Sequence, residues 1–432
     1  MMVISIIGMA LSCTTKPTTD PNIVLIVIDT LRADHLPFYG YKKNTAPFLS
    51  GIASRSLVFE NAYSTSSWTA PATASIFTSL YPFQHKVYLG FRVTQRLQKV
   101  NPTIRLNRIP AEINTVAEVL KEAGYETFAV TDNLNINREQ GFADGFDHFE
   151  NFHYETAEVV NDQVKTWENE IKGEGKYFLY LHYMDPHIKY HKRQPWYKGA
   201  EDPILDKVAA YDSEINYVDD KIREMFEQFN WGENTIVIVT SDHGEEFKEH
   251  GGYQHGKTLY QEVLRVPLLI YFPAGGLDRK KVENNVSVID ILPTIRALIG
   301  LPIDSNNEGI DLISLSNGKS NSTERKLYSH LLKMTRAFQA EISQKDDQVI
   351  KSVINNNWKY IWAPPNYEEF YNLENDPEEK SNKLTEFTEK AMLLKSNLLS
   401  FEKECNKYQQ EYYTLPSNEK LLKELKSLGY VK

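Results

Sequence analysis

The sequence predicts an α/β protein with a mostly parallel central sheet flanked by helices, followed by a smaller part with an antiparallel sheet. Short, continuous, β-branched apolar runs at residues 22–28 and 235–239 are typical of strands covered on both faces. Helical patterns lie between such runs, as a parallel sheet requires. The chain has 432 residues, 41% of them hydrophobic, and exceeds what one compact domain usually holds.

Residues 1–20 are expected to be a targeting segment rather than part of the fold. An apolar run leads into Met9–Cys13, and the loose linker Thr14–Thr19 follows. This pattern resembles a bacterial lipoprotein signal, which is too short to span a bilayer and in which Cys13 would carry acyl chains that attach the protein to a membrane. The cell envelope, either periplasm or outer surface, is then the expected location. The alternative is a cytoplasmic protein whose first dozen residues are merely an apolar tail.

The main catalytic domain is predicted over residues 21–303, and two of its strands end in metal-capable side chains. The strand 22–28 stops at Asp29, and the strand 235–239 leads into Asp242, His243 and Gly244. Parallel strands bring these groups to one edge of the sheet, and Gly244 allows the chain to turn there. Such a set suits Mn²⁺, Mg²⁺, Ca²⁺ or Zn²⁺. The alternative is that Asp242 caps the next element and His243 is a surface residue.

Thr69 is predicted to stand at the N-terminus of a short helix. Pro71 suits a first helical turn, and residues 72–80 read as a helix that stops before Pro82. Thr69 is then an N-cap, or a nucleophile, because the helix dipole and free backbone N–H groups favour an alkoxide and an anionic ester. The two interpretations are compatible.

Other elements follow in order along the main domain. A capping box at Thr115–Glu118 opens a helix that ends at Gly124. Strands are expected at 127–131 and 176–181, an amphipathic helix at 204–229, and a helix at 290–299.

The smaller C-terminal part is predicted over residues 304–432. It starts with a polar loop at 304–325 and ends with a helix at 382–412 and a solvated helix face at 419–426. Between them, short strands at 326–331, 349–354, 358–363 and 369–373 suggest a small antiparallel sheet that walls one side of the active site.

Histidine is concentrated in one region, because six of the eleven histidines lie between residues 182 and 255. A cluster of imidazoles beside strand ends favours a functional site. His182, His191 and His250 stay outside the predicted catalytic set, since a histidine at a strand end or in an acidic loop is more often structural.

A series of motifs resembles, in order, the sulfatase family of the alkaline phosphatase superfamily over about residues 22–385. They are Asp29, Trp68–Ala72, His182–His187, Ser241–Glu245, His255–Pro267, Val288–Thr294, Asn357–Tyr360 and Phe370–Pro377. The resemblance implies that Asp29, Thr69, Asp242 and His243 bind the divalent metal. It also implies that His187, His255 and Lys257 surround the transferring group and the leaving oxygen. Asp185 is a candidate to orient a histidine or to join a second metal site.

The chain departs from this family at the nucleophile. Sulfatases carry C-x-P-S-R or S-x-P-S-R, whose first residue is oxidised to formylglycine, but here the run is Thr69 to Thr73, with sequence TAPAT. Threonine is not a substrate for that oxidation, and Thr73 replaces the arginine. The chain thus resembles relatives with an unmodified Thr nucleophile that act on phosphate esters.

The expected function is a metal-dependent hydrolase that acts on a phosphate (or sulfate) ester through Thr69. The alternatives are a phosphoryl or phosphoglycerol-type transferase, and a catalytically inactive binding lipoprotein. The expected partner is an anionic ester substrate. A net charge of −10 without a basic tract argues against nucleic acid. Cys405 has only Cys13 as a possible partner, so no structural disulfide is expected.

Overall fold

The computed structural model describes residues 21–99, 104–273, 280–319, 325–332, 349–363, 365–405 and 408–413. Cys13, the predicted lipoprotein signal and the predicted helix face at 419–426 lie outside the described residues. Within these ranges, none of the helices combines the length and apolar character needed to cross a membrane.

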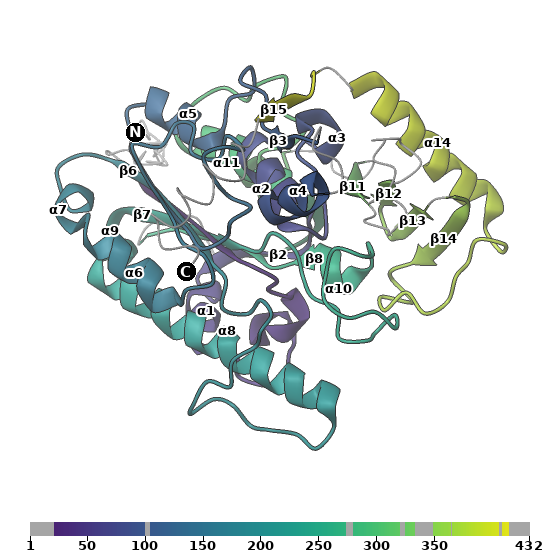
Figure 1. Ribbon diagram of the computed structural model, residues 1–432, viewed down its shortest axis with the longest axis horizontal. Coiled ribbons are helices and arrows are strands. Elements are labelled where there is room, and N and C mark those ends of the chain that lie inside the picture. The colour runs from purple at the N-terminus through teal and green to yellow at the C-terminus, as the bar shows by residue number, and fades with distance from the viewer. Residues whose placement is uncertain are drawn as a thin grey trace, which may run out of the picture.

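A mixed, mostly parallel sheet of nine strands forms the centre of the protein (Figure 1). Its order is β10-β2-β9-β7-β1-β6-β4-β5, with β8 beside β2. The run from β7 to β5 is parallel, whereas β9 is antiparallel to both β7 and β2. The predicted α/β fold class is confirmed. The strands are β1 (Asn22–Ile28), β2 (Ser56–Tyr63), β4 (Glu126–Thr131), β5 (His148–Asn151), β6 (Tyr177–Tyr183), β7 (Thr235–Thr240), β8 (Arg265–Val266), β9 (Leu268–Tyr271) and β10 (Lys280–Ser287).

The register of the three central strands fixes which side chains meet at the sheet edge. Val27 of β1 pairs with His182 of β6 on one side and with Thr240 of β7 on the other. The apolar side chains of β1 are fully buried, as the continuous hydrophobic run predicts for a strand covered on both faces. Residues that follow the ends of these strands are therefore held close together.

Helices cover both faces of the sheet. One face carries α1 (Pro47–Ala53), α6 (Ala157–Lys165), α7 (Glu168–Ile171), α8 (Pro203–Gln228) and α9 (Trp231–Asn234). The other carries α2 (Thr69–Thr78), α5 (Val116–Glu122), α11 (Ile291–Leu298) and α12 (Leu312–Ser316). The predicted capping box of α5 is present, and Asp202 caps α8 by accepting from the N–H groups of Ile204 and Leu205.

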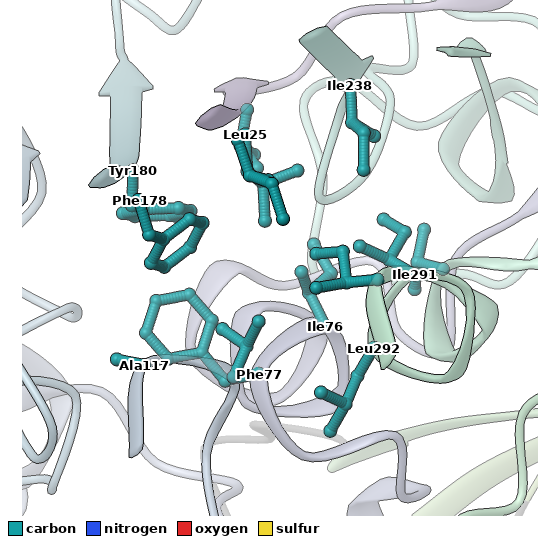
Figure 2. Packing of buried hydrophobic residues seen from close by; sticks show 14 of the residues in the cluster. Leu25, Ile76, Phe77, Ala117, Phe178, Tyr180, Ile238, Ile291 and Leu292 are labelled. Carbon is teal, nitrogen blue, oxygen red and sulfur yellow. The ribbon is translucent and has the colours of Figure 1, made fainter. Parts of the chain in front are cut away.

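Packing against the sheet positions α2, the helix that carries Thr69. Ile76 and Phe77 of α2 lie between the strand residues Leu25, Tyr180 and Ile238 and the α11 residues Ile291 and Leu292 (Figure 2). The ring of Phe77 meets that of Tyr180 edge-on, with centres 4.8 Å apart. The buried side of α2 thus sets the place of its N-terminus.

Several short elements connect these layers. They are the helices α3 (Pro82–His85), α4 (Phe91–Gln98) and α10 (Gln261–Leu264), the 3₁₀ helices Ala33–His35, Pro37–Tyr39 and Val288–Asp290, and the strand β3 (Leu106–Arg108).

A second, antiparallel sheet of four strands is built from the C-terminal part (Figure 1). Its strands are β11 (Lys326–Leu332), β12 (Val349–Asn355), β13 (Trp358–Ala363) and β14 (Tyr367–Asn372), close to the predicted ranges. The helix α14 (Thr388–Cys405) packs onto this sheet through Ala391, Leu394 and Leu398. The predicted small antiparallel sheet is confirmed.

Two details of the C-terminal prediction are wrong. The last helix does not extend over 382–412, because α14 is shorter and the aromatic segment β15 (Glu411–Tyr413) pairs with β3 instead. The polar region 304–325 is not loop throughout, because Asp311 accepts from two backbone N–H groups and caps α12. The boundary at residues 303 and 304 stays a prediction.

Candidate metal centre and active site

Four fully buried side chains meet where β1, β6 and β7 end, and we refer to them as the metal centre. Asp29 follows β1, His182 belongs to the end of β6, and Asp242 and His243 follow β7. Ligand atoms of Asp29, His182 and Asp242 all lie within 4.8 Å of one another. His243 Nε2 lies 3.5 Å from Asp242 Oδ2 and 3.7 Å from Asp29 Oδ1. The alternative of a surface-exposed His243 is therefore wrong.

The metal centre contains polar atoms that the described part of the protein does not satisfy. Asp29 Oδ1, Asp242 Oδ2 and both ring nitrogens of His182 are buried and have no hydrogen-bond partner among the described residues. Unpaired buried polar groups are costly, and two adjacent carboxylates also repel each other. A divalent cation would satisfy both carboxylate oxygens and one of the two His182 nitrogens at once. The residues present therefore fit such an ion.

Burial favours the neutral forms of the side chains in the metal centre, so it raises the pKa values of the carboxyl groups and lowers those of the imidazoles. Burial raises the pKa of Asp242 to about 7, and burial together with the neighbouring Asp242 raises the pKa of Asp29. Burial also lowers the pKa of His182 to about 3 and that of His243 to about 4. Both imidazoles are thus neutral, which is the form that binds metals.

The backbone at Gly244 orients His243. The Nδ1 atom of His243 lies 2.9 Å from the carbonyl oxygen of Gly244, so this nitrogen carries the proton and Nε2 presents its lone pair to the carboxylates. A Cβ at Gly244 would lie 2.1 Å from the carbonyl oxygen of Glu262. Only glycine permits this close turn.

Thr69 is the first residue of α2, and its hydroxyl faces the metal centre. Thr69 Oγ1 lies 3.4 Å from each of Asp29 Oδ2, His243 Nε2 and Asn133 Nδ2. Trp68 occupies the N-cap position, and no side chain caps the helix there. The N-cap interpretation of Thr69 is therefore wrong, and the helix starts at Thr69 rather than at Ala72.

Three imidazoles form a row of mutually tilted rings that leads outwards from the metal centre. The ring centres of His243 and His255 are 4.5 Å apart, and those of His255 and His187 are 4.9 Å apart. His255 Nδ1 lies 3.1 Å from Glu245 Oε1, and the other carboxylate oxygen of Glu245 accepts from the Tyr190 hydroxyl. Burial, and then the charge of His187, lower the pKa of His255 to about 3. The structure thus brings His187 and His255 to the centre.

Lys257 and Asp185 lie apart from this arrangement. The Lys257 side chain is exposed, and its Nζ donates to the carbonyl oxygen of Tyr253 at 2.6 Å. Asp185 pairs with Arg193 at 3.1 Å and accepts from the N–H group of Ala157, so it orients no histidine. The role of Lys257 as an anion clamp stays a prediction.

Sequence reasoning missed two neighbours of Asp29. His182 stands outside the predicted set, although it ends a strand parallel to β1, and its Nε2 lies 3.8 Å from Asp29 Oδ2. Asn133 follows β4 at the same sheet edge and donates to Asp29 Oδ2 at 2.9 Å. The signal for both was the common direction of the strands, which places every strand end at one edge.

Comparisons with known proteins indicate the family of this chain. The sulfatase family model matches residues 21–301, and the model described as N-sulphoglucosamine sulphohydrolase, C-terminal, matches residues 248–404. The ulvan-active sulfatase of Formosa agariphila is 25% identical over 349 residues, which cover 69% of this chain and 65% of that protein. Human arylsulfatase A is 26% identical over 368 residues, which cover 71% and 70%.

Solved structures show the same fold. The phosphonate monoester hydrolase of Agrobacterium radiobacter superposes with a TM-score of 0.72 and 16% identity, covering 89% of this chain and 96% of that one. A 2-O GAG sulfatase gives a TM-score of 0.71 with 18% identity, covering 92% and 98%. The chain spans slightly less than two thirds of the ulvan-active sulfatase and 61% of the arylsulfatase of Hemicentrotus pulcherrimus. Because the family model matches well over half of its residues, this chain belongs to the sulfatase family of the alkaline phosphatase superfamily.

Proposed function

We propose that this protein is a metal-dependent hydrolase of a phosphate (or sulfate) ester, with Thr69 as its nucleophile. The observation that carries the proposal is the position of an unmodified hydroxyl at the first residue of α2, within 3.4 Å of Asp29, His243 and Asn133. The ten-residue helix directs its positive end and free N–H groups at the same place. An anionic ester and a developing alkoxide are both stabilised there.

The metal centre would hold the divalent ion through Asp29, His182, Asp242 and His243. When bound, such an ion supplies positive charge that polarises the ester and lowers the pKa of a neighbouring hydroxyl. Asn133 holds Asp29 Oδ2 by a hydrogen bond, which fixes the orientation of that carboxylate.

In the first half of the reaction, Thr69 Oγ1 forms a bond to phosphorus while the bond from phosphorus to the alcohol oxygen breaks. The Thr69 proton passes to solvent. His255 donates a proton from Nε2 to the leaving alcohol, and Glu245 accepts from its Nδ1. The anionic ester beside His255 raises the pKa of this imidazole from its low value in the free protein, because opposite charges favour the protonated form.

In the second half, water attacks the phosphothreonine and releases Thr69. His255, now neutral, takes a proton from the water. The Thr69 oxygen leaves with the electron pair of its bond to phosphorus and regains a proton from solvent. A transferase would use the same residues with an alcohol in place of water. A formylglycine residue can release sulfate by collapsing to its aldehyde, but threonine cannot form an aldehyde in this way. The threonine therefore favours phosphate over sulfate as the transferring group.

The intact ion site favours catalysis over an inactive binding lipoprotein. Two buried carboxylates beside a buried hydroxyl are unfavourable without a cation. A protein that only bound its ligand would gain nothing from this costly arrangement, whereas a hydrolase uses the cation and the hydroxyl together. Attachment to the cell envelope through Cys13 stays a prediction.

A matched hydrolysis screen tests the proposed function. The full-length protein is loaded in turn with Mn²⁺, Mg²⁺, Ca²⁺ or Zn²⁺ and assayed with 4-nitrophenyl phosphate, 4-nitrophenyl sulfate and bis(4-nitrophenyl) phosphate. We expect metal-dependent phosphoester cleavage that falls by at least about 10⁴-fold in Thr69→Ala, with partial activity in Thr69→Ser. Preferred cleavage of the sulfate would contradict the phosphate assignment. Turnover that persists in Thr69→Ala would contradict the nucleophile.

A further inference from the structure

Three side chains outside the metal centre, Arg92, His153 and Tyr154, form a polar group that we refer to as the rim. The Tyr154 side chain is 48% exposed, and its ring centre lies 5.6 Å from that of His187. Because His187 is the outer ring of the imidazole row, Tyr154 extends this row of rings from the metal centre to the surface. Partial burial of Tyr154, and then the charge of Asp29, raise its pKa. The rim therefore lies at the entrance to the site.

Arg92 brings a positive charge to the rim. Its guanidinium carbon lies 5.5 Å from the centre of the Tyr154 ring, and its Nη2 donates to His153 Nε2. His153 is neutral, because burial and the charge of Arg92 lower its pKa to about 4. Arg92 has no acidic partner within the described ranges. Arg193, by contrast, forms an ion pair with Glu214, with its Nε 2.7 Å from Glu214 Oε2. The charge of Arg92 is thus available to a ligand.

The backbone holds Tyr154 in an unusual conformation. Its φ of 56° lies in the left-handed region, which costs about 1 kcal/mol or more for a residue that is not glycine. The next residue, Glu155, donates its N–H to Asp132 Oδ1 at 3.0 Å. Asp132 directly precedes Asn133, which contacts both Asp29 and Thr69. The strained loop is therefore tied to the same chain segment that supports the metal centre.

The helix α4, which carries Arg92, is tied to that segment as well. The Phe91 N–H donates to Asn135 Oδ1 at 3.0 Å, and the Asn135 N–H donates to Asn133 Oδ1 at 2.9 Å. A Cβ at Gly90 would lie 2.2 Å from Asn135 Oδ1, so a larger residue at this position would displace the Asn135 side chain. Arg92 and Tyr154 thus reach the entrance from different segments, and both are anchored beside Asp29.

We propose that the rim is a specificity subsite that binds an anionic group on the alcohol part of the substrate. The reacting ester would occupy the metal centre, while a second anion on the same molecule pairs with Arg92. A carboxylate suits this position best, because the planar guanidinium matches its geometry, and Tyr154 offers a ring face to a sugar or aryl ring. The favoured substrates are then esters of carboxylate-bearing alcohols. This inference rests on the proposed function of the metal centre.

Binding of a matched pair of hydrolysis-resistant ligands tests the subsite without requiring turnover. Calorimetry compares 4-(phosphonomethyl)benzoate with 4-(phosphonomethyl)benzamide, which have nearly the same shape but differ in the charge of the remote group. Both are titrated into the full-length protein loaded with its tightest-binding divalent cation. We expect the benzoate to bind about threefold to tenfold more tightly, with a smaller difference at high salt because the pair is exposed.

Variants assign that preference to the rim. Arg92→Gln should remove it, Arg92→Lys should keep part of it, and Tyr154→Ala should weaken binding of both ligands. Arg223→Gln, which removes a half-buried arginine on α8, should leave the preference unchanged. A preference that survives Arg92→Gln, equal weakening of both ligands by this variant, or no measurable binding of either ligand would overturn the subsite.

Kinetics separate failure of the subsite from failure of the proposed function. Thr69-dependent turnover of aryl phosphates without any preference for the carboxylate would leave the hydrolase proposal in place and overturn the subsite. A carboxylate preference that depends on Arg92, in a protein without Thr69-dependent turnover, would support the subsite and contradict the hydrolase.

Discussion

The metal centre and the rim differ in how the fold holds them. The metal centre consists of fully buried side chains at the ends of β1, β6 and β7, whose mutual positions follow from the sheet register. In the rim, Arg92 and Tyr154 are exposed. The rim comes from a short helix and a loop, held by side-chain hydrogen bonds at Asp132 and Asn135. The sheet thus fixes the proposed chemistry, while connecting segments set the proposed specificity, as is common for sites on rigid scaffolds.

Asp29→Asn should have the largest effect, because it removes a charge from the metal centre and leaves the rim intact. We expect metal affinity to fall by more than about 100-fold, because changes in residues that only support a metal ligand already cost up to about that much. Turnover should be lost together with the metal. Calorimetric titration with Mn²⁺ or Zn²⁺ measures this change. Unchanged metal affinity in the folded variant would show that the ion lies elsewhere.

His182→Ala sharpens the definition of the metal centre. If His182 contributes a ligand, as its unpaired ring nitrogens suggest, metal affinity should fall by about 10- to 100-fold or more. His191→Ala is the matched control, since His191 is exposed and outside the cluster. Equal metal affinities in the two variants would show that His182 is structural and not a metal ligand.

The affinity for the metal should depend on pH. Because burial raises the pKa of Asp242 to about 7, its carboxyl group is protonated below that pH and must lose the proton to bind a cation. Affinity should therefore rise with pH by about tenfold per unit up to about pH 7, for one proton released, and level off above it. Binding isotherms from pH 5.5 to 8.5 measure this. A flat profile would show that Asp242 is already ionised in the free protein.

Metal-free protein should lose stability over the same interval. A carboxyl group whose folded pKa lies above its unfolded value binds more protons in the folded state, so the free energy of unfolding falls as pH rises from about 4 to 7. A bound cation stabilises the carboxylate and should remove this fall. Thermal unfolding with EDTA, and again with the cation, checks the sign. Rising stability of the metal-free protein over this range would contradict the raised pKa values of Asp29 and Asp242.

Ile76→Val should have the smallest effect, because Ile76 belongs to neither the metal centre nor the rim. Ile76 is fully buried on α2 between strands and α11 (Figure 2), so loss of one methylene group should cost about 0.5 to 1.5 kcal/mol of unfolding free energy. Chemical denaturation measures the change. Metal affinity and ligand preference should stay the same, and a loss of either would show that both regions depend on fine packing under α2.

The sequence predicts the buried half of the molecule better than its surface. Apolar runs mark β1 and β7, and residues after a strand end have one geometric outcome in a parallel sheet, so Asp29, Asp242 and His243 could be placed together. His182 and Asn133 obey the same rule but carry no distinctive local signal. Arg92 and Tyr154 are separated by 62 positions and meet through loop hydrogen bonds that no periodicity encodes. The position of the Lys257 side chain likewise depends on a local contact with Tyr253.

The central claim is that Thr69 forms a covalent bond to the transferring group. The most direct measurement is mass spectrometry of peptides from protein quenched in acid during turnover of an aryl phosphate. The proposed function predicts phosphorylation on the peptide that contains Thr69, absent without metal and absent in Thr69→Ala. Turnover with the phosphoryl group on another residue, or full turnover in Thr69→Ala, would contradict the claim.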